Sequence, residues 1–484
     1  MKSKWHMPHP ATMFLLLTGV VVFLSWICDV YGLQVVHPQT GEEIRVQNLL
    51  SPEGVRWWLK HVITNFTGFA PVGMVIVAMF GFGLAEHSGM TAAFIRRKSG
   101  APFRKDAVLV SVILLGLISN VVGDAGYVIM LSIAATLFHA AGLHPVAGII
   151  TAYVSVACGY SANVFIGTLD PLLSGITQEA AYISGMDMSS YGPLSNYYFM
   201  AVSTFLLLGI IYLITRRSLL PALGAYQGEV KFEGYRKLTR KERRALLLAV
   251  VVGLGYLLLI LLSTFSSWGI LRGVNGGLVR SPFLVGILFL LSLGVGLMGT
   301  VYGFSSGRYR SDSDVVEGLA QPMKMLGVYF VIAFFAAQLF ACLEYTQLDQ
   351  CLSIVGADLL SAAELPAIGI LILFILFTAT INLIIPSAST KWAFMAFIFI
   401  PVLGRVGVAP EVVQCAFRIG DSATNAVTPF LFYVPLVLTC MQQYDKESTY
   451  GTLLRYTWKY SLIILLVWSL LFIGWYLPGI PLGL

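Results

Sequence analysis

RIGDSATNAVTPF, the stretch Arg418–Phe430, interrupts an apolar run that extends from residue 410 to residue 438. A second apolar run, residues 146–183, is interrupted in the same way by GYSANVFIGTLDPLLSG. Both stretches combine glycine, a Ser-Ala-(Thr)-Asn core, an aspartate and a proline, so each predicts a helix that unwinds partway along its length. Lipid cannot satisfy unwound backbone, which therefore needs protein partners or a cavity. We expect both breaks to line a cavity.

The composition predicts an all-α polytopic membrane protein. Of the 484 residues, 57% are hydrophobic and 11% are charged, whereas about a quarter of the residues in a soluble domain are charged. The first apolar run, Ala11–Tyr31, is long enough to span a bilayer and lacks a small-residue cleavage site, so we interpret it as the first membrane helix. The net charge of +6 reflects orientation in the bilayer, and no nucleic-acid partner is expected.

Clusters of basic residues predict which loops face the cytoplasm. They lie at residues 96–105, 216–244, 308–310 and 446–459, and basic loops are retained on the cytoplasmic side. The loops at residues 33–60 and 346–364 then lie outside. Spans of about 20 residues between the clusters leave two pairs of apolar runs that are too short to cross comfortably. A re-entrant helical hairpin fits each pair best, although two short spans would give the same orientation.

The order of span, hairpin, broken span and span occurs twice with opposite orientation, which indicates inverted-topology repeats with about nine transmembrane helices plus two re-entrant hairpins. Residues 1–68 form the first transmembrane helix and an outside loop, and residues 218–318 form a cytoplasmic loop and two scaffold helices. Repeat 1 is residues 69–217, with a hairpin at about 106–141 and the broken helix at about 146–183. Repeat 2 is residues 319–484, with a hairpin at about 366–404 and the broken helix at about 410–438.

Four asparagines at hairpin tips and helix breaks are candidate ligands of a small cation. Asn120 and Asn382 belong to the tips, and Asn163 and Asn425 belong to the breaks. Together with Asp421 they offer the hard oxygen atoms that such cations prefer, so they are possible Na⁺ ligands. Asn120 and Asn382 could instead cap the hairpin arms. We expect Na⁺ or H⁺ as the coupling ion and no other cofactor.

Aspartates within apolar segments need a reason to be there, because each costs about 2.5 to 3.5 kcal/mol on insertion scales. Asp124, Asp170 and Asp421 are such residues. Asp421 follows Arg418 by three residues, so on a helix the two could neutralise each other or face a substrate.

Two further side chains at the head of the run 387–403 allow alternative interpretations. Lys391 is typical of an anchor that extends to the membrane surface. Trp392 is either a residue of the interfacial aromatic belt or a pocket wall. Its ring could stack on an aromatic substrate.

Other classes of protein are not indicated. The sequence has neither HExxH nor GxxxxGK[ST], so we expect neither a metalloprotease nor an ATP-driven pump, and no enzymatic activity. The six cysteines have no metal-binding spacing, although Cys342 and Cys351 could pair at a membrane surface.

Four long strings resemble the AbgT family of p-aminobenzoyl-glutamate transporters. They are residues 65–89, 144–177, 387–402 and 417–430, and the resemblance extends from Pro8 to the last span. It implies nine spans plus two hairpins, a homodimer in the bacterial inner (cytoplasmic) membrane, and cation-driven transport of p-aminobenzoyl-glutamate or related antimetabolites such as sulfonamides. It also implies substrate-binding positions at Asp170, Asn382, Ser389, Trp392, Pro410, Arg418 and Asp421. Thr390 and Phe397 depart from the family pattern, which has Ala and Pro there.

The resulting hypothesis is a secondary transporter that exports aromatic antimetabolites by exchange with a cation. Trp392 would stack on the aminobenzoyl ring, and Arg418 would bind the glutamate carboxylates. The alternative is a Na⁺/dicarboxylate symporter, because such carriers share the hairpin architecture.

Overall fold

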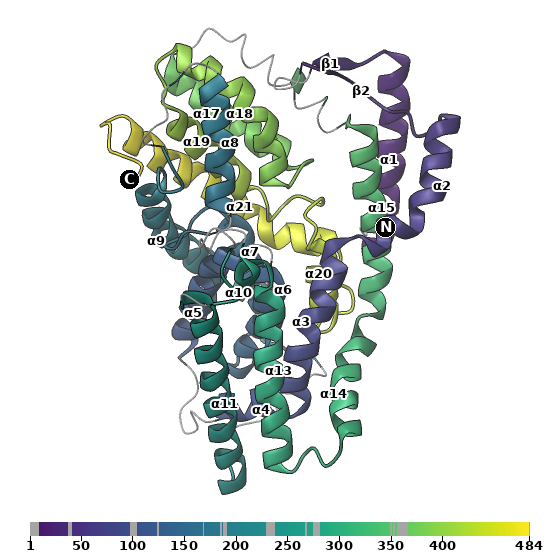
Figure 1. Cartoon of the computed structure of the whole chain (residues 1–484), viewed down its shortest axis with the longest axis vertical. Coiled ribbons are helices and arrows are strands. Elements are labelled where there is room, and N and C mark those ends of the chain that lie inside the picture. The colour runs from purple at the N-terminus through teal and green to yellow at the C-terminus, as the bar shows by residue number, and fades with distance from the viewer. Residues whose placement is uncertain are drawn as a thin grey trace.

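The computed structural model describes residues 9–36, 41–96, 104–122, 125–167, 169–183, 186, 191–228, 238–266, 269–273, 281–348, 351, 354–355 and 366–483 (Figure 1). Within these ranges the regular secondary structure is helical apart from one antiparallel ribbon of β1 (Gln34–Val36) and β2 (Glu43–Arg45). Six helical segments there are long and apolar enough to cross a membrane, and five apolar helices are shorter. The predicted all-α polytopic fold is confirmed.

One group of helices packs around α13 and forms a small hydrophobic core of its own. Its members are α3 (Ala70–His87), α4 (Met90–Arg96), α11 (Arg240–Phe265), α12 (Pro282–Val285), α13 (Ile287–Ser306) and α14 (Asp312–Met325). Gly81 permits the close approach of α3 and α13, because a Cβ atom there would lie 1.9 Å from the Ser292 carbonyl oxygen. We call α3, α4, α11, α13 and α14 the frame helices.

The end of α13 contains the string GFSSG, Gly303–Gly307, which matches the G-x-S-x-G pattern of hydrolases. That pattern requires a strand-to-helix turn that exposes the serine. Here the string is helical up to Ser306, whose hydroxyl donates a hydrogen bond to the Gly303 carbonyl oxygen (3.1 Å). This segment therefore lacks the geometry of a nucleophile elbow.

The segment predicted as an outside loop contains a helix. α2 (Pro52–Thr67) begins at Ser51, whose hydroxyl accepts a hydrogen bond from the Gly54 amide, and it packs on α15 (Gly327–Thr346) beside α1 (Pro10–Val30). Trp58 Nε1 donates to Gln338 Oε1 on α15 (3.3 Å). The first helical segment of the predicted repeat 2 is interrupted at Leu326, where α14 ends and α15 begins.

Two helix pairs lie where the sequence predicts hairpins. Hairpin 1 consists of α5 (Lys105–Ser119), η1 (Asn120–Val122) and α6 (Ala125–Ala140), and hairpin 2 consists of α17 (Ala367–Asn382) and α18 (Ala388–Arg405). The 16 residues of α17 span about 24 Å, less than the roughly 30 Å of a bilayer core. Neither α17 nor the 16-residue α6 can therefore cross a membrane upright.

The remaining helices pack into the main hydrophobic core with the hairpins. They are α7 (Pro145–Cys158), α8 (Leu169–Ile183), α9 (Tyr197–Ile214), η2 (Thr215–Leu219), α10 (Leu220–Leu223), α19 (Pro410–Ala423), α20 (Val434–Gln442) and α21 (Tyr450–Tyr476). α6 packs on α7, and α17 packs on α19, so each hairpin contacts the broken helix that follows it in the chain.

The predicted orientation can be tested by labelling. β1, β2 and α2 lie at one end of the molecule, and α4 and the turn between α13 and α14 lie at the other (Figure 1). Glu43 and Lys241 are both exposed, so a cysteine at either position should be accessible to a reagent on its own side of the membrane. With the native cysteines replaced, we expect an impermeant maleimide to label Glu43→Cys in intact cells and Lys241→Cys only after permeabilisation. Labelling of Lys241→Cys in intact cells would contradict the inverted-repeat arrangement.

Candidate substrate and cation site

Both predicted interruptions are breaks between helices, and the two breaks contact each other. The first separates α7 from α8, and the second separates α19 from α20. The Tyr153 hydroxyl on α7 donates to the Asn425 carbonyl oxygen (3.3 Å), and Asn425 Nδ2 donates to the Ala157 carbonyl oxygen (3.1 Å). Ala157 lies in the last turn of α7, where carbonyl groups lack partners within the helix. Each half of the chain thus satisfies polar groups that the other half exposes.

Asn382, the last residue of α17, connects hairpin 2 to the second break. Its Nδ2 donates to the Asp421 carbonyl oxygen (2.7 Å), Thr424 Oγ1 (3.0 Å) and Asn425 Oδ1 (2.8 Å). These bonds make Asn382 a donor toward the break, which leaves only its Oδ1 atom to bind a cation. Its role as a cation ligand stays a prediction.

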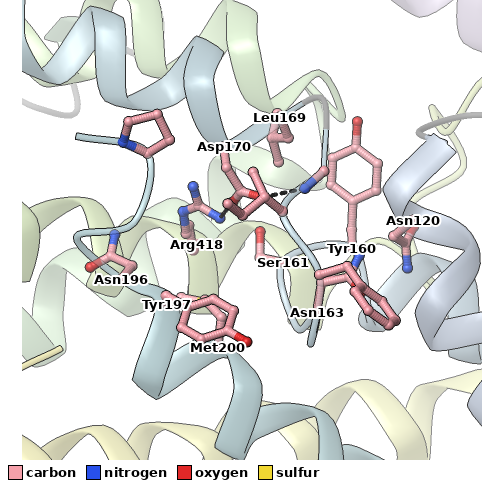
Figure 2. A pocket seen from close by; sticks show the side chains of 14 residues that line it. Asn120, Tyr160, Ser161, Asn163, Leu169, Asp170, Asn196, Tyr197, Met200 and Arg418 are labelled. Atoms are coloured by element: carbon pink, nitrogen blue, oxygen red, sulfur yellow. Dashed lines mark hydrogen bonds and ion pairs between the residues drawn. The ribbon is translucent and has the colours of Figure 1, made fainter. Parts of the chain in front are cut away.

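Arg418 pairs with Asp170 and does not neutralise Asp421, which corrects the first alternative considered for that pair. Arg418 Nη1 lies 2.6 Å from Asp170 Oδ1, and the side chains are 3% and 18% exposed. Asp170 Oδ2 accepts a hydrogen bond from the Gly167 amide (2.7 Å; Figure 2). Arg418 therefore reaches the first broken helix while Asp421 faces hairpin 2.

Lys391 is buried, so its interpretation as a surface anchor is wrong. Its Nζ lies 2.6 Å from Asp421 Oδ1, with side-chain exposures of 0% and 1%, and it also donates to Asn382 Oδ1. Lys391 lies in the first turn of α18, and its side chain is directed into the protein, where it is fully buried. Two buried charges are tolerated here because each compensates the other.

Trp392 is fully buried, which excludes a place in the interfacial belt. Its Nε1 donates to Thr177 Oγ1 (2.9 Å) and to the Leu173 carbonyl oxygen (3.2 Å), and its ring centroid lies 4.6 Å from that of Phe417. The indole therefore joins hairpin 2 to α8.

Sequence reasoning missed three polar residues that extend this contact. Gln414 Nε2 donates to Thr177 Oγ1 (2.8 Å), and Asn196 Nδ2 donates to Gln414 Oε1 (2.6 Å). All three residues are buried. The available signal was Gln414, a polar side chain in the apolar run that precedes the second break.

A small pocket of about 20 Å³ lies beside the first break (Figure 2). Its lining includes four residues that the sequence predicts, namely Asn120, Asn163, Asp170 and Arg418. Figure 2 shows Asp170 and Arg418 paired on one side of Ser161, with Asn163 and Asn120 on the other. The pocket thus places a charged pair and several amide and hydroxyl groups around one space.

Four oxygen atoms of residues around this pocket lack hydrogen bonds. Asn120 Oδ1, Ser161 Oγ, Asn163 Oδ1 and Asn196 Oδ1 are buried and have no partner within the described part of the chain. Asn120 is held in place by its other amide atom, because Nδ2 donates to the carbonyl oxygens of Leu117 (3.2 Å) and Val156 (3.1 Å). Unpartnered buried oxygens are costly unless a ligand compensates them.

The other predicted site residues lie away from this pocket. Ser389 is half-buried in the first turn of α18, with its hydroxyl oxygen 3.4 Å from Ser387 Oγ, and Pro410 begins α19 about two turns before Arg418. Asn382, Trp392, Asp421 and Asn425 form the neighbouring contacts described above. Asp124 lies outside the described residues.

Cys342 and Cys351 are both buried and form no disulfide with each other. Within the described ranges, no group of three His, Cys, Asp or Glu residues could hold a metal ion.

A larger cavity of about 260 Å³ lies between frame helices and the main core. Residues of α3 and α14, including Glu86 and Gln321, line one side, and residues of α6, α7 and α20, including Ile149, line the other. Packing between these two groups of helices is therefore incomplete here.

Each of the two broken helices packs against a hairpin. One buried ion pair connects the two broken helices, and another connects hairpin 2 to the second broken helix. This is the architecture of a membrane transporter. A family model described as the AbgT putative transporter family matches residues 4–484, and the chain belongs to this family. The chain is 34% identical over 477 residues to the p-aminobenzoyl-glutamate transport protein of Escherichia coli K12, covering 98% of this chain and 93% of the relative.

Two solved structures are also similar to this chain. The YdaH transporter of Alcanivorax borkumensis, described as having an unusual topology, is 36% identical with a TM-score of 0.53, covering 99% of this chain and 100% of that one. MtrF of Neisseria gonorrhoeae, described as illuminating a class of antimetabolite efflux pumps, is 38% identical with a TM-score of 0.52, covering 98% of each chain.

Proposed function

We propose that this transporter is a cation-coupled secondary carrier that exports p-aminobenzoyl-glutamate or related antimetabolites, such as sulfonamides, across the bacterial inner membrane. The observation that carries the proposal is Arg418 at the pocket, paired with Asp170 on a different broken helix. Arg418 Nε is buried and has no hydrogen-bond partner within the described residues. A guanidinium whose Nε–H group has no partner can donate a hydrogen bond to a second carboxylate while it keeps its existing partner.

The lining of the pocket suits an aromatic carboxylate. Its volume of about 20 Å³ is below the roughly 300–1,000 Å³ of small-molecule sites, so the pocket must widen to admit such a substrate. Tyr160, Phe165 and Tyr197 contribute aromatic rings to the lining, and the Arg418 guanidinium provides the charge that a glutamate moiety needs. Trp392 is engaged with Phe417 and Thr177, so its stacking on substrate would require this contact to open.

The first break supports the proposed cation coupling. Asn120 Oδ1, Ser161 Oγ and Asn163 Oδ1 offer the neutral hard oxygens that suit Na⁺, and they are among the buried atoms of the pocket that have no hydrogen-bond partner in the described part of the chain. At the second break, Asn382 Oδ1 and Asp421 Oδ1 face Lys391, and Asn425 Oδ1 accepts from Asn382. The two halves of the chain therefore differ in the oxygens that they leave for an ion.

Flux measurements in proteoliposomes test the transport proposal. With Na⁺ and pH gradients imposed separately, we expect saturable movement of labelled p-aminobenzoyl-glutamate that one of the two gradients drives. A sulfonamide should compete for this movement and succinate should not. Competition by succinate alone would favour the Na⁺/dicarboxylate symporter. Cross-linking in native membranes would test the homodimer that the family resemblance implies.

Substitution at the first break tests the cation ligands. We expect Asn120→Ala and Asn163→Ala each to raise the cation concentration needed for half-maximal transport by at least about tenfold, the equivalent of about 1.4 kcal/mol for a lost ligand. Asn65→Ala, which removes an amide that bonds to Gln338 far from the pocket, is the matched control. Wild-type cation dependence in both variants would exclude these ligands.

A further inference from the structure

The Lys391 ammonium lies where hairpin 2 and the second break present oxygen atoms to each other. It contacts Asp421 Oδ1 (2.6 Å) from the broken helix and Asn382 Oδ1 from the hairpin tip. These two oxygens are among the predicted ligands of a coupling cation, and both residues are buried. A positive charge with oxygen neighbours from both elements thus already sits at the second break.

The first half of the chain has no equivalent charge. No lysine or arginine occurs between Lys105 and Arg216, the interval that contains hairpin 1 and the first break. Accordingly, Asn120 Oδ1 and Asn163 Oδ1 have no hydrogen-bond partner within the described residues. The same types of side chain, an asparagine at a tip and an asparagine at a break, therefore meet an ammonium only in the second half.

The charges at the second break already balance, so binding of another cation there is electrostatically unfavourable. Asp421 is the carboxylate that Lys391 balances, and Arg418 is directed away to Asp170. A Na⁺ ion beside Lys391 would set two positive charges against one buried carboxylate. Two positive charges that share one buried carboxylate, shielded from water, repel each other strongly.

We propose that Lys391 is a tethered cation that fills the second cation position, so that the second break holds its own ammonium in place of a mobile Na⁺ ion. If the protein transports as proposed, coupling ions would then act only at the first break, and this conclusion rests on the proposed function. The conclusion that Lys391 occupies the second cation position does not depend on the proposed function. Removal of the ammonium should convert the second break into a Na⁺ site, with Asn382 Oδ1 and both Asp421 carboxylate oxygens available as ligands.

Thermal unfolding of purified protein in detergent tests this conversion without any organic substrate. Wild type, Lys391→Ala and Lys391→Ala/Asp421→Asn are compared in NaCl and in choline chloride at equal ionic strength. We expect Lys391→Ala to be destabilised in choline, because Asp421 loses its partner, and to gain several degrees more from Na⁺ than the wild type does. The double variant should lose this extra gain. Lys459→Ala, which deletes an exposed lysine, should behave as the wild type.

Direct binding of radiolabelled Na⁺ keeps the test open if Lys391→Ala does not fold. Lys391→Gln, which retains much of the side-chain volume, and its double variant with Asp421→Asn are then used. We expect one additional bound Na⁺ per chain in Lys391→Gln and none in its double variant. The proposal would be overturned if the wild type, Lys391→Ala and Lys391→Gln responded equally to Na⁺. It would also be overturned if the wild type bound Na⁺ in a way that the single substitution Asp421→Asn abolished. Failure of organic-substrate flux would affect the proposed function and leave this result unchanged.

Discussion

Arg418→Ala is expected to weaken the binding of p-aminobenzoyl-glutamate by at least about thirtyfold, while a sulfonamide without a carboxylate loses less than about threefold. The first figure corresponds to about 2 kcal/mol, the lower end of the cost of removing one partner from a buried charged pair. The difference between the ligands arises because only the carboxylate depends on the guanidinium, whose Nε has no other partner within the described residues. Titrations of purified protein with both ligands measure it.

Two further variants show whether the effect belongs to the site. Arg455→Ala removes an exposed arginine and should leave both affinities unchanged. Asp170→Asn removes the carboxylate that competes for Arg418, so the affinity for p-aminobenzoyl-glutamate should rise. If Arg418→Ala folds normally and loses both ligands equally, the Arg418–Asp170 pair has only a structural role.

Gly420→Ala is expected to lower the melting temperature markedly and to abolish transport. A Cβ atom at Gly420 would lie 2.4 Å from the Ile375 carbonyl oxygen and 2.8 Å from Thr378 Cβ, so α17 and α19 would have to separate. Overpacking of this kind typically costs about 1–3 kcal/mol. The displacement would also move Asp421, the next residue, away from Asn382.

The matched control for this substitution is Gly209→Ala. Gly209 also lies within a helix, α9, but a Cβ atom there would meet nothing within 4 Å. We expect its melting temperature in detergent to equal or exceed that of the wild type, since alanine favours a helix over glycine. An unchanged melting temperature in Gly420→Ala would show that α17 and α19 can separate without cost.

The sequence predicted the fold class and the positions of the breaks, because both follow from local composition. Apolar arms of 15 to 18 residues and interruptions rich in Gly, Asn and Pro are visible without knowing any partner. α2 was missed because its 16 residues mix apolar side chains with Arg56 and Lys60, so the segment does not resemble a membrane span.

The partners of the buried charges could not be predicted in the same way. Arg418 was considered with Asp421, its neighbour in the chain, whereas its partner Asp170 lies 248 residues away. Lys391 was interpreted from its place at the end of an apolar run, and its burial depends on α8 and α19 packing around α18. Local patterns show that a charge needs compensation, and only the packed structure shows which group supplies it.

The hydrogen bonds that Trp392 and Gln414 share with Thr177 have a consequence for how the protein opens to each side of the membrane. They fasten hairpin 2 and the second broken helix to the first broken helix, so these parts cannot slide past one another without breaking buried bonds. The incompletely packed boundary lies elsewhere, at the cavity between α3, α14 and the core. We therefore expect both breaks to move together as one rigid body, relative to stationary frame helices, when the protein opens to one side of the membrane and then to the other.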